Sequence, residues 1–165
     1  MKTLKSKIQP VILCGGRGTR LFPFSPKKHP KPFLKIFRRT SFFQDTILRV
    51  SDNNTFEIPL IVGNITHQNL IEEQCVEIGI QKPRLLLEEQ AKNTFPAFVA
   101  ASRMFDNDTP LLFLPSDHVI DDQDEFCEAI VEGYKILMQN QTIITFGIEP
   151  TRAETAYGYI NVKDK

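Results

Sequence analysis

Short apolar segments alternate with longer segments of mixed polarity along the 165-residue chain. Each apolar segment is mostly continuous and does not alternate with polar residues, which is typical of strands that are covered on both faces of a sheet. The segments predict five short β-strands, at residues 11–14, 59–62, 85–87, 111–114 and 142–146.

The first two intervening segments carry helix signals. Ser41 and Gln44 have the spacing of a capping box, which predicts a helix that continues to about Val50. Residues 66–78 carry apolar side chains at helical spacing, and Gly79 follows as the predicted stop.

Two further helices are predicted downstream. Residues 96–105 are rich in Ala and Phe and have Pro96 near the start, where proline is tolerated. Asp124 is predicted to cap the last helix, which Gly133 is expected to weaken slightly. One apolar stripe of that helix contains Phe126, Ile130, Tyr134 and Leu137.

The order of strands and helices predicts an α/β fold with a mostly parallel sheet and helices on both of its faces. The chain length favours a single domain over residues 1–165. Ligands of such sheets bind beyond the carboxyl ends of the strands. A glycine cluster follows the first predicted strand directly, and the sequence LPSDH, residues 114–118, includes the end of the fourth. These two segments are therefore expected to face one crevice.

Charge and cysteine content narrow the functional classes. Lys+Arg and Asp+Glu both number 20, which argues against a general nucleic-acid or membrane-surface binder. Positive charge is instead concentrated between Arg17 and Arg39. The widely spaced Cys14, Cys75 and Cys127 indicate neither a disulfide framework nor a zinc site. A reducing cytoplasm is the favoured location, since no signal core or run of membrane-spanning length is visible.

The basic segment begins in the loop after the first predicted strand and reads PVILCGGRGTRLFPFSPKKHPKPF over residues 10–33. A Walker A loop requires Lys and Ser or Thr directly after its last glycine, whereas Thr19 and Arg20 stand there. The dinucleotide fingerprint requires a third glycine where Leu21 stands, and Pro23 and Pro26 would break the helix that must follow. Both of these phosphate-binding loops are therefore excluded.

The loop nevertheless contains the residue types of a phosphate site. Gly15, Gly16 and Gly18 allow backbone amides to approach a ligand closely. Arg20 is able to bind phosphate oxygens in a bidentate fork, and Lys31 places a point charge between two prolines. The alternative interpretation is a surface loop whose charges are solvated.

The same loop, GGRGTRLFPFSPKKHPKPF, resembles the signature of the mannose-1-phosphate guanylyltransferases among the sugar-nucleotide pyrophosphorylases. Three more segments agree in order, namely LLEEQAKNTFPAF, LLFLPSDHVI and TFGIEPTRAETAYGYI. The resemblance implies a Rossmann-like fold of the nucleotide-diphospho-sugar transferase type. It also implies nucleotidyl transfer from GTP to mannose 1-phosphate, which gives pyrophosphate and GDP-mannose for polysaccharide precursors.

The resemblance further implies roles for individual residues. Arg20 and Lys31 would neutralise the triphosphate and the departing pyrophosphate, and Asp117 would hold the cofactor Mg²⁺. Tyr157 and Gly158 would approach the sugar. The nucleotide would be bound by Gly15, Gly16, Gly18, Thr19, Glu88, Asn93 and Thr94. The glycines of this set would cradle the phosphates, and its last three members would lie near guanine and ribose.

Each of these residues also has a purely structural interpretation. Asp117 is alternatively a turn residue or a helix cap, and Asn93 is alternatively the cap of the next helix. Glu88 and Glu89 are alternatively a solvated pair. Tyr157 lies in an alternating pattern that is typical of an ordinary strand.

Some positions depart from the family pattern, namely Pro26, Pro32, Glu89, Lys92 and Ala156. The E-K-P and W-N-S-G segments that follow in the family are absent, so a truncated domain that lacks most of the sugar-binding part is expected. One alternative is therefore a GTP–Mg²⁺-binding remnant without turnover, and another is a nucleotidyltransferase for a different base. A homo-oligomer or a complementing second polypeptide is the protein partner to consider, and neither nucleic acid nor membrane is expected as a partner.

Overall fold

The computed structural model describes residues 4–15, 30–90, 93–155 and 157–161. The contacts within the chain divide it into two compact units, Met1–Asp121 and Asp122–Lys165. The sheet belongs to the first unit, and the last helix belongs to the second. The single domain expected from the sequence stays a prediction. None of the described helices combines the length and the apolar character that a membrane span requires.

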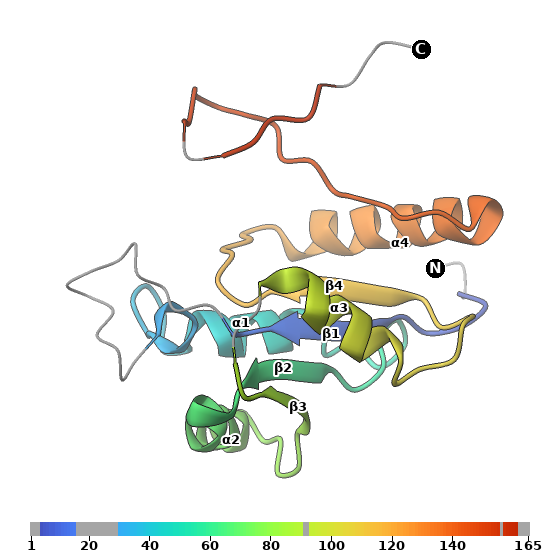
Figure 1. Ribbon diagram of the computed structural model, residues 1–165. Helices are drawn as coiled ribbons and strands as arrows, with labels where there is room; N and C mark the ends of the chain where they lie inside the picture. The colour runs from blue at the N-terminus through green and yellow to red at the C-terminus, as the bar shows by residue number, and fades with distance from the viewer. Residues whose placement is uncertain (1–3, 16–29, 91–92, 156, 162–165) are drawn as a thin grey trace. The chain divides into compact units, whose positions relative to one another are not determined.

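A parallel sheet of four strands forms the centre of the first unit (Figure 1). The strands are β1 (Gln9–Leu13), β2 (Leu60–Asn64), β3 (Arg84–Glu88) and β4 (Leu111–Pro115). They lie in the order β3-β2-β1-β4, so β1 pairs with β2 on one side and with β4 on the other. The first four predicted strands and the parallel sheet are confirmed.

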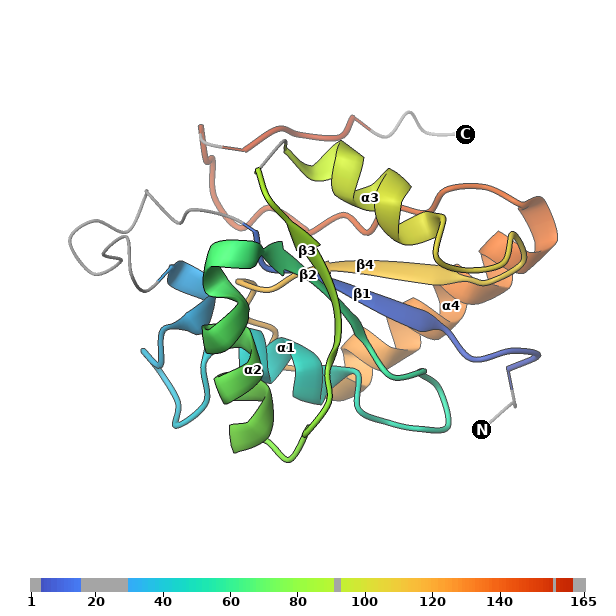
Figure 2. The ribbon, with the colours of Figure 1, turned by 60° about the horizontal axis from the view of Figure 1, so that its bottom comes forward.

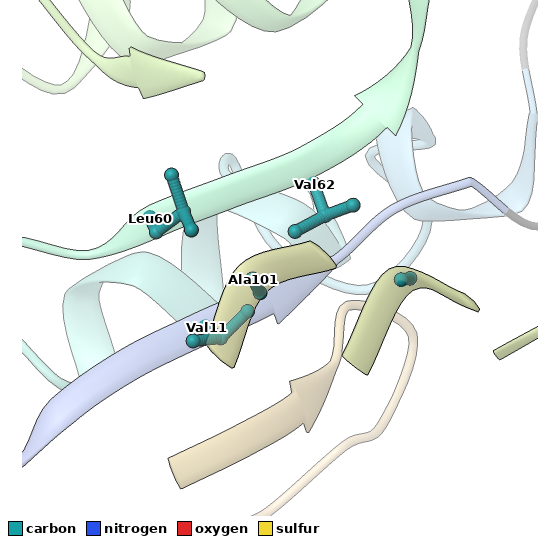
Figure 3. Packing of buried hydrophobic residues seen from close by; sticks show 5 residues of the cluster. Val11, Leu60, Val62 and Ala101 are labelled. Atoms are coloured by element: carbon teal, nitrogen blue, oxygen red, sulfur yellow. The ribbon is translucent and has the colours of Figure 1, made fainter. Parts of the chain in front are cut away.

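One face of the sheet is covered by α3 (Thr94–Ser102). Successive side chains of a strand point to opposite faces, and Val11, Leu60 and Val62 all point to this one. They pack with Ala97 and Ala101 of the helix in a buried cluster (Figure 3). Burying a Val or Leu side chain stabilises the fold by about 1.5–3 kcal/mol, so this cluster fixes α3 against the sheet.

The opposite face carries α1 (Phe42–Arg49) and α2 (Gln68–Glu77), as Figure 2 shows. Gly63 of β2 and Ile71 of α2 meet so closely that a Cβ atom added at Gly63 would lie 2.6 Å from Ile71 Cδ1. With α3 on one face and α1 and α2 on the other, the prediction of helices on both faces is confirmed.

The capping box predicted for α1 is present. The Gln44 amide donates to Ser41 Oγ at 3.1 Å, and the Ser41 amide donates to Gln44 Oε1 at 2.9 Å. Ser41 is buried and its hydroxyl also donates to Gln74 Oε1 at 2.6 Å, which joins the start of α1 to α2. The local signal in the sequence therefore also serves a tertiary contact.

Two helix boundaries differ from the prediction. The short 3-10 helix η3 (Ile65–His67) precedes α2, and Gly79 ends α2 with a φ of 89°, as predicted. The structure begins α3 at Thr94 and ends it at Ser102, whereas the sequence predicted residues 96–105. Pro96 falls inside the first turn, where backbone amides have no intrahelical partner, so the proline does not have to be the first helical residue.

The second unit contains α4 (Gln123–Asn140). Its cap is Asp122, which accepts a hydrogen bond from the Glu125 amide at 2.8 Å, so the prediction of Asp124 as the cap is wrong. Gly133 allows a close approach by Phe146, whose Cζ would lie 2.7 Å from an added Cβ. This contact explains a glycine that the sequence marked only as a weak point of the helix.

The predicted strand at residues 142–146 is not formed, and the described part of the second unit contains no strand. The segment is mostly exposed, with Ile143 among its exposed residues, so its apolar character does not lead to burial either. A strand also requires a neighbouring strand that satisfies its backbone N–H and C=O groups, and apolar character does not supply one. The strand interpretation of Tyr157 fails in the same way.

Candidate nucleotide site

All four strands are parallel, so their carboxyl ends meet at one edge of the sheet. Gly15 lies just beyond the end of β1, Glu88 ends β3, and Asp117 lies just beyond the end of β4. The chain runs from β1 to β2 and β3 on one side of β1, and then from β3 to β4 on its other side, which makes the gap between β1 and β4 a topological switch point. Sheets of this type bind their ligands at such a point.

Ser116 ties the ends of β1 and β4 together. Both its backbone amide, at 3.1 Å, and its hydroxyl, at 2.7 Å, donate to the carbonyl oxygen of Leu13. The side chain is buried. The sequence analysis assigned no role to Ser116, although its place beside Asp117 in LPSDH was a usable signal. The two hydrogen bonds hold the loop that carries Asp117 beside the loop that begins at Gly15.

Lys31 and Asp117 form an ion pair across this edge. The Lys31 Nζ atom donates to Asp117 Oδ2 at 3.0 Å, although 86 positions separate the residues in the sequence. The side chains are 30% and 38% exposed, so both remain accessible to a ligand. The interpretation of the basic loop as a set of fully solvated charges does not describe Lys31. Asp117 lies in the turn after β4, as its structural interpretation predicted, and it is not the cap of the next helix.

The backbone that carries Lys31 is firmly anchored. Lys31 begins the 3-10 helix η2 (Lys31–Phe33), whose preceding and middle residues are both prolines. Phe33 is buried and packs edge-on against Phe43, with 5.3 Å between the ring centroids. The carbonyl of Phe33 also accepts a hydrogen bond from Gln74 Nε2 at 3.0 Å. The main chain of this segment is thus fixed, whereas the lysine head group is half-exposed.

Phe42 completes the surroundings of the lysine. The Nζ atom of Lys31 lies 5.7 Å from the centroid of the Phe42 ring, within the range of a cation–π interaction. The sequence did not indicate this contact, because Phe42 is recognisable there only as a residue at the start of a predicted helix. The lysine therefore has an aromatic neighbour that stabilises its charge independently of Asp117.

Glu88 approaches the glycine loop from β3. A Cβ atom added at Gly15 would lie 3.3 Å from Glu88 Oε2, so the glycine leaves room for this carboxylate. Glu88 is half-buried, whereas Glu89 is exposed. The two residues are therefore not an equivalent solvated pair, and only Glu88 is directed towards the loop after β1.

Asn93 has a backbone conformation that asparagine rarely adopts. Its φ is 64° and its ψ is −172°, in a region populated essentially by glycine, and such a conformation costs about 1–3 kcal/mol. Asn93 is the residue that precedes α3, but its side chain makes no capping hydrogen bond. Asn93 thus stands at the capping position of α3, as the alternative interpretation predicted, but its side chain does not cap the helix. Thr94 follows as the first residue of the helix and is exposed.

Cys14 adjoins Gly15 and is not a nucleophile. Its thiol is fully buried and donates to the Val62 carbonyl at 3.2 Å. Burial raises the pKa of Cys14 far above the usual thiol range, and the nearby Cys75 and Glu88 raise it further. Because only a thiolate is strongly nucleophilic, Cys14 has a structural role beside the glycine loop.

Several predicted site residues are not brought into this arrangement. Gly16, Gly18, Thr19 and Arg20 lie outside the described residues. Tyr157 and Gly158 belong to the second unit, where Tyr157 is exposed in a segment without regular secondary structure. Among the described residues, the structure brings together Lys31 with Asp117 and Gly15 with Glu88, while Asn93 and Thr94 lie at the start of α3.

Asp117 fits one kind of metal ion. Within residues 4–15, 30–90, 93–155 and 157–161, no three His, Cys, Asp or Glu side chains gather as a complete ligand set. An ion at Asp117 would have to take most of its ligands from water and from phosphate oxygens. This is how Mg²⁺ is usually bound in phosphate-transferring sites, by one or two carboxylates together with the substrate.

Comparisons with known proteins show the family of the chain. A family profile described as nucleotidyl transferase matches residues 9–165. The chain is 40% identical over 162 residues to a mannose-1-phosphate guanylyltransferase of Sinorhizobium fredii, with 96% of this chain and 31% of the relative covered. It is 42% identical over 158 residues to the xanthan biosynthesis protein XanB of Xanthomonas campestris, with 94% and 33% covered. The chain thus spans about a third of the length of these relatives.

A solved structure shares the fold. The crystal structure of a mannose-6-phosphate isomerase from Helicobacter pylori superposes with a TM-score of 0.67 at 29% identity, covering 81% of this chain and 47% of that chain. The resemblance to the mannose-1-phosphate guanylyltransferases, inferred from four ordered segments, is confirmed by the relatives over most of the chain. With residues 9–165 matched by the family profile, the chain belongs to the nucleotidyl transferase family.

Proposed function

We propose that this chain carries the nucleotide-binding part of an enzyme that transfers a guanylyl group from GTP to mannose 1-phosphate. The products would be GDP-mannose, a precursor for polysaccharides, and pyrophosphate. The observation that carries the proposal is that Gly15, Lys31, Glu88 and Asp117 gather at the carboxyl edge of the sheet, where Lys31 pairs with Asp117 and Glu88 approaches Gly15. The names of the relatives that match most of this chain supply the substrate class.

The reaction needs no protein nucleophile. A phosphate oxygen of mannose 1-phosphate attacks the α-phosphorus of GTP, the new P–O bond forms, and the bond to the β-phosphate oxygen breaks with release of pyrophosphate. Negative charge increases on the departing pyrophosphate, and Lys31 is suited to neutralise it. Mg²⁺ held by Asp117 would supply further neutralisation of the phosphate oxygens when bound.

The opposite end of the site suits a guanine nucleoside. The Glu88 carboxylate accepts hydrogen bonds only, and guanine presents N–H donors on its Watson–Crick edge. Asn93 and Thr94 add a side-chain amide and a hydroxyl at the exposed start of α3. We propose that these three residues lie along the base and the ribose, with Gly16, Gly18, Thr19 and Arg20 around the phosphates and Tyr157 and Gly158 at the sugar.

Calorimetry with GTP and Mg²⁺, followed by an assay of pyrophosphate release with mannose 1-phosphate, tests the proposal. Binding and release are expected for a competent enzyme. Binding without release would favour a non-catalytic remnant. Equal competition by UTP would favour another base, and a lack of any nucleotide binding would contradict the proposal.

The cysteines support a proposal for the compartment. Cys14, Cys75 and Cys127 form no disulfide in the described part of the chain. Cysteines outside disulfides persist in the reducing cytoplasm, where GTP is also available, and we propose that the protein acts there.

A further inference from the structure

We propose that Lys31 is a built-in counter-ion of Asp117 that a divalent cation displaces, so that one lysine couples cation binding to triphosphate binding. The inference rests on the proposed function, which assigns the cation to Asp117 and the triphosphate to Lys31. It adds that the two residues do not act independently. In the ligand-free protein the Lys31 ammonium lies where the cation would bind to Asp117, and the Asp117 carboxylate lies where a phosphate would bind to Lys31.

The geometry of the ion pair supports this competition. The Lys31 ammonium lies 3.0 Å from Asp117 Oδ2, and no other hydrogen bond of either side chain occurs within the described part of the chain. Mg²⁺ binds a carboxylate oxygen at about 2.1 Å. An ammonium that remained in place would lie beside this ion, and the two positive charges would repel each other. A cation at Asp117 therefore requires Lys31 to move.

The lysine is able to move without its backbone. Its segment is fixed by the prolines of η2 and by the packing of Phe33, whereas the charged group sits on a flexible four-carbon stem. The Phe42 ring, 5.7 Å from Nζ, provides a surface along which the released ammonium stays stabilised. The released charge thus remains at the edge where the phosphates are expected.

The ion pair is also weak enough to be exchanged. Both side chains are about one third exposed. Ion pairs that are this accessible contribute little to stability, because water and salt screen them. Lys31 therefore neutralises Asp117 in the absence of ligand, and the ion pair does not fix the loop that carries Asp117.

Thermodynamic linkage gives the functional consequence. If a cation at Asp117 frees Lys31, the cation raises the affinity for triphosphate, and triphosphate bound to Lys31 must raise the affinity for the cation by the same factor. The protein would then favour the nucleotide–metal complex over either component alone. A metal-free triphosphate would find its lysine still engaged with Asp117.

Titration with Mn²⁺ in the absence of nucleotide, followed by electron paramagnetic resonance of the free ion, tests the inference without any activity measurement. Lys31→Met is expected to bind Mn²⁺ roughly three- to tenfold more tightly than the wild type, because Asp117 loses its competitor. Adding Asp117→Asn to this variant should abolish the gain. The result is counterintuitive for a residue proposed to bind phosphate, which makes it a sharp criterion.

Lys35→Met is the matched control. Lys35 pairs with Glu77 at 2.7 Å, but Glu77 keeps a second hydrogen bond from Gln44 Nε2 at 2.7 Å, so Mn²⁺ affinity should stay within about twofold. An equal gain in both lysine variants would show a nonspecific charge effect and overturn the inference. Unchanged affinity in Lys31→Met would overturn it as well.

A second variant guards against misfolding. Lys31→Gln keeps most of the side-chain length, and circular dichroism establishes which of the two variants is folded before titration. The inference and the proposed function fail in different ways. If wild-type protein binds GTP with Mg²⁺ while both Lys31 variants leave Mn²⁺ affinity unchanged, only the counter-ion role is lost. If wild-type protein binds no GTP, the proposed function itself is lost.

Discussion

At the scale of single residues, the site contains groups whose conformation or pairing is not optimal for stability. Asn93 occupies a backbone region that suits glycine, and its side chain does not cap α3. Lys31 and Asp117 neutralise each other's charge in a partly exposed ion pair. Residues held in rare conformations cluster at functional sites, where the surrounding structure maintains them. These residues are consequently where stability and binding should respond differently to mutation.

Asn93 allows a direct test of this separation. Asn93→Gly is expected to be about 1–2 kcal/mol more stable than Asn93→Ala, because only glycine adopts a φ of 64° with an extended ψ without strain. Both variants should lose GTP affinity, because both remove the amide. Urea denaturation and calorimetry measure the two quantities. Equal stability of the two variants would mean that the backbone at Asn93 is not strained.

Lys31 gives a second prediction at this scale. Lys31→Ala should weaken GTP binding by about tenfold or more while GMP binding changes by less than about twofold, since only GTP carries the phosphates that the ammonium is proposed to contact. Calorimetry with both nucleotides compares the losses, and Lys35→Ala is the control for a general charge effect. The same pattern is expected for Arg20→Ala. Equal losses for GTP and GMP would place Lys31 away from the outer phosphates.

At the scale of helices and strands, sequence patterns succeeded where the determining contacts are local. The capping box of Ser41 and Gln44 lies within four residues and was predictable, as were the four strands of the sheet. The prediction of a strand at residues 142–146 was wrong, because apolar character does not show whether a partner strand is present. The predicted cap of α4, Asp124, lies two residues after the observed cap, Asp122, because the sequence DDQDE offers several carboxylates that could cap a helix.

The packing of β2 against α2 makes a prediction at this scale. Gly63→Ala should destabilise the protein by about 1–3 kcal/mol, because its Cβ would lie 2.6 Å from Ile71 Cδ1 and 3.0 Å from Cys14 Sγ. Combining it with Ile71→Val, which removes the clashing methyl group, should restore part of the loss. Thermal unfolding followed by circular dichroism measures both effects.

Gly147→Ala is the control for the β2 substitution. An added Cβ at Gly147 meets nothing within 4 Å and its φ is not positive, so stability should change by less than about 0.5 kcal/mol. Similar losses at Gly63 and Gly147 would indicate that backbone flexibility and not packing decides the outcome.

At the scale of the whole molecule, the site depends on contacts that no sequence pattern encodes. The ion pair of Lys31 and Asp117 joins residues 86 positions apart, and the approach of Glu88 to Gly15 crosses the whole width of β2. The resemblance to a family identified these residues as candidates. Only the fold showed that Lys31 and Asp117 are partners, and that Phe42 and Ser116 support them.

The stability of the molecule should depend on pH through His67. Burial lowers the pKa of His67, and its Nδ1 is buried with no hydrogen-bond partner among the described residues. The unfolded chain therefore takes up a proton at His67 at a higher pH than the folded protein does, and stability falls as the pH drops below about 6.5. The melting temperature should decrease between pH 7.5 and 5.5.

His67→Gln is the comparison for this pH effect, since it should show a smaller decrease over the same interval. Hydrogen bonds lower the carboxyl pKa values of Asp52 and Glu77, and the stability that these groups contribute is also lost as the pH falls, but only below about pH 4.5. The interval from 7.5 to 5.5 therefore excludes the effect of these two carboxyl groups. An identical decrease in the variant would exclude His67 as its cause.

The central position of β1 has a consequence for how the protein is made. The strand that leads into the glycine loop emerges first from the ribosome, yet its second neighbour, β4, and the hydrogen bond from Ser116 to Leu13 come from 103 residues later. Pairings of such long sequence separation form slowly. β1 is thus synthesised well before its neighbour β4, and nascent chains released before Ser116 would carry the glycine loop without the contact that joins it to Asp117.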